Sequence, residues 1–185
     1  SQGSEIITAV RTRRETLVWT DHTLHSIQFI GPPYTFGTAL LADNTKIAGP
    51  NTAMDINDLV YWMGYQNFYV NVLPCSVRSY VFDDLNRQQS FKFHVGSVSI
   101  HSEVWWFYCS ADSTEIDRYV IFNYLDRVWY FGTLVRTTLN DGTSGARSFP
   151  QATDTTGFLY NQENGLNDVD SAISAHIESA DFDIE

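Results

Sequence analysis

The stretch that decides the fold is Glu103-Val104-Trp105-Trp106-Phe107-Tyr108. In a β-strand, successive side chains point to opposite faces, so one face would carry Val104, Trp106 and Tyr108 while the other would carry two further aromatic residues. A sheet with one face in water alternates apolar and polar residues. This run therefore predicts a strand that is covered on both faces by neighbouring layers.

Comparable runs recur along the chain. Trp19, Trp62 and Trp106 lie 43 and 44 residues apart, each in a bulky run, and the next comparable aromatic residue, Tyr160, follows 54 residues later. The runs expected to form hairpins are 17–20 with 24–29, 60–63 with 68–70, and 104–108 with 118–124 and 128–131, and a fourth run at 157–161 is expected to form a strand. A period of about 40–50 residues built on antiparallel hairpins is typical of β-propeller blades. The pattern predicts a mostly β, propeller-like chain of about four blades, with a β-sandwich around an aromatic core as the alternative.

The repeats divide the chain into four parts: 1–50, 51–100, 101–149 and 150–185. A short helix is expected within 76–89, where Val77, Val81 and Leu85 recur every four positions, and a weaker helical pattern covers 172–177. Four blades are about the lower limit for a propeller. The chain also ends in an alternating acidic and apolar run, so we expect it to be part of a larger protein.

The charge is uneven along the chain. There are 22 acidic residues against 11 Lys and Arg, and residues 151–185 hold eight acids and no Lys or Arg. Such a balance argues against broad non-specific binding of nucleic acid, because acidic surfaces repel phosphates. Arg11, Arg13 and Arg14 form the one basic cluster, which we expect to make a subunit or rim contact. No apolar run is long enough for a membrane span, and no signal-peptide pattern is present.

No motif of the sequence indicates catalysis or metal binding. The residues considered were the cysteines Cys75 and Cys109, the histidines His22, His25, His94 and His101, and the acidic groups Asp83-Asp84 and Asp112, Glu115 and Asp117. Two cysteines make at most one disulfide and are expected to be buried thiols, and the histidines lack metal-site spacing. Adjacent Asp83 and Asp84 would point apart, and the second acidic group is interpreted as part of a solvated hairpin loop. Phosphate-binding loops and nucleophile elbows are also absent from the sequence. We therefore predict no enzyme, no cofactor, and no catalytic, cofactor-binding or metal-ligating residue.

The sequence resembles a group of tailed-phage virion proteins. The resemblance is carried by residues 103–108, 115–120, 123–129 and 132–134, and also by 29–33, 61–64, 67–69, 73–75, 84–86, Gln88, 157–160, Glu163 and Gly165. These segments are similar to the propeller-bearing nozzle (tail tubular protein B) and to packaged-DNA stabilisation proteins. The resemblance covers roughly residues 5–185, and its motifs are structural, without a catalytic residue.

The resemblance implies a virion protein of the phage tail. It implies a nozzle subunit, placed in a six-fold ring of identical copies below the portal and adaptor, that contacts tail fibre proteins and lines the channel through which DNA leaves. We expect the loops 111–116 and 140–147 to contact neighbours. Acidic residues such as Asp168, Asp170, Asp181 and Asp183 would repel passing DNA and allow it to slide. A glycan-binding propeller for host recognition is the alternative function, and a glycoside hydrolase is a third.

Overall fold

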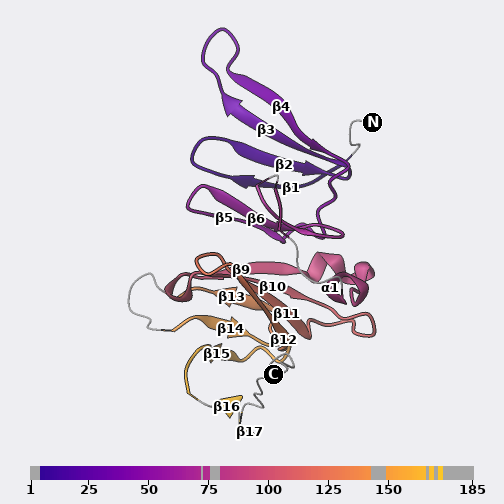
Figure 1. Ribbon diagram of the computed structural model, residues 1–185, viewed down its shortest axis with the longest axis vertical. Coiled ribbons are helices and arrows are strands. Elements are labelled where there is room, and N and C mark those ends of the chain that lie inside the picture. Colours follow the sequence, from indigo (N-terminus) through magenta and orange to yellow (C-terminus); the bar gives the residue numbers. More distant parts are fainter. Residues whose placement is uncertain are drawn as a thin grey trace, which may run out of the picture.

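The computed structural model describes residues 5–71, 73–75, 80–142, 149–165, 167–168 and 171–172. This part of the chain is mostly β and contains four antiparallel sheets of three or four strands, together with a two-stranded ribbon. Figure 1 shows the sheets one above another along the long axis, with the first and fourth sheets toward opposite ends. The prediction of a mostly β chain of antiparallel repeats is confirmed.

Within every sheet, strands that follow one another in sequence are hydrogen-bonded neighbours. The first sheet contains β1 (Ile6–Arg11), β2 (Thr16–Thr20), β3 (Thr23–Phe29) and β4 (Phe36–Asp43). The second contains β5 (Ala53–Ile56), β6 (Leu59–Met63), β7 (Phe68–Val70) and β8 (Leu73–Cys75). The third contains β9 (His94–Val98), β10 (Glu103–Tyr108), β11 (Arg118–Asn123) and β12 (Val128–Thr133). The fourth contains β13 (Thr138–Asn140), β14 (Gln151–Thr153) and β15 (Leu159–Asn161), and β16 (Asn167–Asp168) pairs with β17 (Ser171–Ala172).

The first strands of successive sheets lie against one another. Strand β1 contacts β5, β5 contacts β9, and β9 contacts β13. The backbone amide of Val95 in β9 also donates to the carbonyl of Asn51, just before β5, at 2.9 Å. In a propeller the blades are arranged radially around an axis. The first strand of each blade should therefore contact the first strand of the next, as it does in this structure. The fold is therefore propeller-like rather than the two-sheet sandwich that was the alternative.

The three spaced tryptophans are buried in the second strand of their sheets. Trp19 and Trp62 pack together between the first and second sheets, with ring centroids 5.6 Å apart. Trp106 packs on Phe68 between the second and third sheets, with ring centroids 4.7 Å apart. Its indole N–H donates to the carbonyl of Thr52 at 3.1 Å. Trp19 thus faces the following sheet, whereas Trp62 and Trp106 face the preceding one. The period therefore marks the same position along the strand, the fourth residue of β2, β6 and β10, but not the same face of the sheet.

Tyr160 does not continue the tryptophan series. It lies in β15, the third strand of its sheet, and the second strand carries the buried Ala152 instead. The Tyr160 hydroxyl donates to Asp154 at 3.1 Å, and the Arg136 guanidinium lies 4.6 Å from the ring centroid. That sequence prediction is wrong because this tyrosine supports a polar contact, while a small residue fills the second strand.

The repeats and the helix differ in detail from the predicted ranges. The third sheet begins at His94 and the fourth at Thr138, so each takes its first strand from residues assigned to the preceding repeat. The helical segment is a single turn, α1 (Tyr80–Asp83), followed by the 3-10 helix η1 (Arg87–Lys92), and a further 3-10 turn, η2 (Ser99–His101), precedes β10. Residues 76–79 and 173–177, where the other helical predictions fall, lie outside the described residues.

We expect the substitution Gly96→Ala to destabilise the contact between the third and fourth sheets. A Cβ atom on Gly96 would lie 2.8 Å from a methyl carbon of Leu139 in β13. Overpacking of this kind costs about 1–3 kcal/mol. Urea unfolding would measure this loss, and the same substitution in a Leu139→Ala background should cost clearly less. An equal cost in both backgrounds would contradict the steric explanation.

Candidate functional site

The first sheet has an apolar outer face. Leu17, Trp19 and Leu24 cluster with residues of the second sheet, so the alternating side chains of β2 and β3 point the other way. The strand register places the buried Val18 and the polar His25 and Thr38 on that outward side. Four further apolar residues lie there, which we call the outer patch: Ile27, Phe29, Phe36 and Leu40. Phe29 and Phe36 pair across β3 and β4 in an edge-to-face contact, with centroids 6.1 Å apart.

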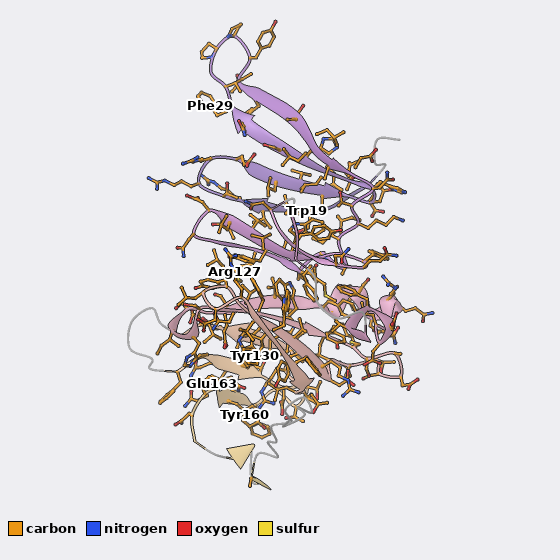
Figure 2. The ribbon with its side chains drawn as sticks, viewed as in Figure 1. Trp19, Phe29, Arg127, Tyr130, Tyr160 and Glu163 are labelled. Atoms are coloured by element: carbon orange, nitrogen blue, oxygen red, sulfur yellow. The ribbon has the colours of Figure 1, made fainter. Side chains whose placement is uncertain are left out.

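The outer patch is strongly exposed. Phe29, Phe36 and Leu40 are 70%, 65% and 56% exposed. Figure 2 places Phe29 on the hairpin that projects at one end of the stack, whereas Trp19 lies inside it. Two more apolar residues of the connecting loop, Ile30 and Tyr34, are also exposed. Exposed apolar side chains that gather on one face make it a candidate interaction site.

The basic cluster and the acidic region of the sequence lie in different parts of the stack. Arg11 ends β1, and Arg13 and Arg14 follow in the exposed turn to β2, where the Arg13 amide donates to Asp58 at 3.2 Å. At the other end, Asp154, Glu163 and Asp168 belong to the acidic region in which no Lys or Arg occurs. The predicted basic cluster is therefore an exposed feature of the first sheet, and its role as a contact stays a prediction.

A groove of about 550 Å³ opens where the first strands of the sheets begin. Its walls come from three places in the sequence: Asn51 before β5, the segment from Phe91 to Val95 at the start of β9, and the segment from Thr137 to Leu139 at the start of β13. Glu115 and Ile116 of the β10–β11 loop complete it. Phe91 is 60% exposed, and the Lys92 ammonium lies 2.6 Å from the Glu115 carboxylate. The groove combines apolar surface with a few polar groups, as ligand sites do.

His94 lies in the wall of this groove. Its ring stacks on Phe107 with centroids 4.7 Å apart, and its Nε2 atom is buried without a hydrogen-bond partner. Burial lowers the pKa of His94 from 6.5 to about 4, so the ring is neutral at pH 7. The other histidines are spread over the molecule: His22 lies 2.9 Å from Asp21, His25 bonds to Thr23 at 2.8 Å, and His101 accepts through its carbonyl from Asn123.

The acidic residues singled out from the sequence have structural partners. Asp84 accepts from the amide of Ala111 and lies 3.3 Å from the Arg118 guanidinium. Asp117 accepts from both the amide and the hydroxyl of Ser110, at 2.7 and 2.6 Å. These contacts fix the two ends of the β10–β11 loop. Asp112 is exposed, in agreement with its interpretation as solvated.

The β10–β11 loop, residues 111–116, is held by the same chain. The Asn86 amide donates to the carbonyl of Ser113 at 2.9 Å, and the Lys92 ammonium donates to the carbonyl of Thr114 at 2.8 Å. Its contact with neighbours stays a prediction. Of the second predicted contact loop, 140–147, residues 143–147 lie outside the described residues, and so do Asp170, Asp181 and Asp183 of the acidic set.

Cys109 is a buried free thiol at the end of β10, and burial raises its pKa to about 11. The described ranges contain no group of three or more His, Cys, Asp or Glu residues placed to hold a metal ion. They also contain no helix that combines the length and the apolar character needed to cross a membrane.

Comparison with known proteins adds no relative: no family model and no curated protein matches the chain. Phe29, His94 and Glu115 of the two surfaces described above were already singled out in the sequence, but Phe36, Phe91 and Thr138 were not. Their types and spacing carry no motif. Exposure is their distinguishing property, and only the packed fold reveals it.

Proposed function

We propose that this chain is a structural, non-enzymatic module of a tailed-phage virion, nozzle-like in role, that assembles through the outer patch of its first sheet. The observation that carries the proposal is the exposure of Phe29, Phe36 and Leu40 on the projecting β3–β4 hairpin of a sheet whose inward residues Leu17, Trp19 and Leu24 are packed. Burial of one such side chain contributes about 1.5–3 kcal/mol. Burial of the outer patch would therefore contribute enough free energy to stabilise a subunit contact.

The occupant that we propose for the outer patch is a second copy of the same chain. Within the chain, successive sheets already pack face to face through aromatic contacts such as Trp19 on Trp62. The outer patch offers one more face of the same kind. The basic cluster Arg11, Arg13 and Arg14 at the β1–β2 turn is opposite in charge to the acidic region after residue 150. A head-to-tail contact between identical copies uses both features, and such contacts form rings when the rotation closes.

The resemblance to nozzle proteins gives this assembly its proposed setting. The ring would be six-fold, lie below the portal and adaptor, contact tail fibre proteins, and form part of the wall of the DNA-exit channel. An acidic wall does not hold phosphates, so DNA would pass without sequence-specific binding. Asp168 in β16 is the member of the proposed acidic set that the structure describes.

We expect the double substitution Phe29→Ser and Phe36→Ser to weaken self-association of the full chain by about a hundredfold, because two buried phenyl rings are lost. Sedimentation equilibrium over a range of protein concentrations measures the dissociation constant. Added salt and Arg11→Glu should weaken the same contact by a smaller factor, because exposed charges are screened.

The matched control is Phe91→Ser, which removes another exposed phenylalanine at 60% exposure, away from the first sheet. This variant should associate like the unmodified chain. A chain that stays monomeric at every concentration, or one that associates equally well in all variants, would contradict the assembly proposal.

A further inference from the structure

We propose that the groove at the starts of β9 and β13 is a binding site for a neutral pyranose sugar, with Phe91 as the surface on which the sugar ring stacks. The inference concerns a different surface from the outer patch and does not depend on assembly. It rests on the shape of the groove, on its charge balance and on the chemistry of the side chains that line it.

The shape fits a small ligand. A volume of about 550 Å³ falls in the range of about 300–1,000 Å³ that is usual for small-molecule sites. The groove is formed where the segment before β5 meets the starts of β9 and β13. The Val95–Asn51 hydrogen bond of 2.9 Å joins the first two of these segments, and β9 also contacts β13, so the walls of the groove are held together by the fold.

The charge balance selects a neutral ligand. Of the described residues that line the groove, Lys92 and Glu115 carry charge, and they compensate each other at 2.6 Å. His94 adds no charge at pH 7, because burial keeps its pKa near 4. An anion would meet the Glu115 carboxylate and a cation would meet the Lys92 ammonium. A ligand without charge avoids both repulsions.

The side chains match a sugar rather than a purely apolar molecule. A pyranose ring presents C–H groups on its face and hydroxyl groups around its rim. The negative face of an aromatic ring attracts such C–H groups, and Phe91 lines the groove at 60% exposure. The Lys92 ammonium lies 6.0 Å from the Phe91 ring centroid, and no aromatic ring packs on Phe91 in the described contacts, so we place the sugar on the ring face away from Lys92. Asn51 offers both an amide donor and an acceptor, and Glu115 offers free acceptor positions beside its lysine partner.

Other exposed phenylalanines lack this combination. Phe158 is 67% exposed but is not among the groove residues, and Phe29 lies on the outer patch, among other apolar side chains. At the groove, by contrast, the exposed Phe91 ring lies beside the polar groups of Asn51 and Glu115.

The test is a titration of the isotope-labelled full chain with methyl β-D-glucopyranoside, methyl α-D-mannopyranoside and methyl β-D-galactopyranoside, followed by amide NMR shifts. We expect at least one of these sugars to give saturable shifts, in the millimolar range, at Val95, Ile116 and Leu139. Sodium acetate and inorganic phosphate are the charged probes and should give no saturable shift there.

The variant Phe91→Ala should raise the dissociation constant for the sugar at least tenfold, and Asn51→Ala provides a second, independent loss at an exposed side chain. The control Phe158→Ala should bind like the unmodified chain. The proposal is overturned if no sugar gives saturable shifts, if the shifts fall outside the groove, if Phe91→Ala binds unchanged, or if a charged probe binds there more tightly. Self-association can succeed or fail independently of these results, because the groove and the outer patch share no residue.

Discussion

Replacing Trp106 with alanine is expected to lower the free energy of unfolding by about 3–5 kcal/mol, the range for removing a fully buried large aromatic side chain. Trp106 is 1% exposed and packs on Phe68 of the second sheet. The substitution leaves a cavity between two sheets and removes the donor to the carbonyl of Thr52. Urea unfolding followed by far-UV circular dichroism would measure the loss.

Two further variants separate the causes of this loss. Trp106→Phe keeps most of the packing but lacks the indole N–H, so it should cost clearly less than alanine, with about 1 kcal/mol of the loss due to the hydrogen bond. Trp129→Ala removes a partly buried tryptophan from the same cluster and should also cost less than Trp106→Ala. A Trp106→Ala protein whose unfolding free energy stays within about 1 kcal/mol of the unmodified chain would show that the sheets do not depend on this contact.

The sequence predicted the central hairpins well because their strands need large side chains on both faces. Segments such as residues 104–108 pack against a sheet on either side, and this requirement is visible as consecutive aromatic residues. The first strands were missed for the opposite reason. Strand β9 reads His-Val-Gly-Ser-Val, and its Gly96 must stay small because Leu139 approaches it. Where a neighbouring sheet approaches closely, the strand needs small residues, so its sequence lacks the run of large apolar residues by which a strand is predicted.

The two candidate surfaces could not be predicted in the same way. Alternation along β3 and β4 can tell which residues share a face, but not whether another layer covers that face. Phe29 was part of a predicted hairpin, and its 70% exposure follows from the position of its sheet at the end of the stack. The groove brings together Asn51, Phe91 and Thr138, which meet only because the starts of successive first strands lie side by side.

The unfolding free energy is expected to fall on acidification because of His94. Burial lowers the pKa of His94 in the folded state to about 4, against 6.5 in an unfolded chain. Between these values the unfolded state binds a proton that the folded state does not bind. The contribution to stability is therefore complete above pH 6.5 and is lost as the pH falls toward 4, with a limiting slope of about 1.4 kcal/mol per pH unit.

The variant His94→Gln isolates this effect, because glutamine is polar but does not titrate. Between pH 7 and pH 5 the unmodified chain should lose about 2 kcal/mol more stability than His94→Gln in urea unfolding. The control His101→Gln replaces an exposed histidine and should keep the steep dependence. If His94→Gln retained the pH profile of the unmodified chain, His94 would have to accept a proton in the folded state without destabilising it. The buried Nε2 atom, which has no hydrogen-bond partner, argues against that, because a charge placed there would have nothing to stabilise it.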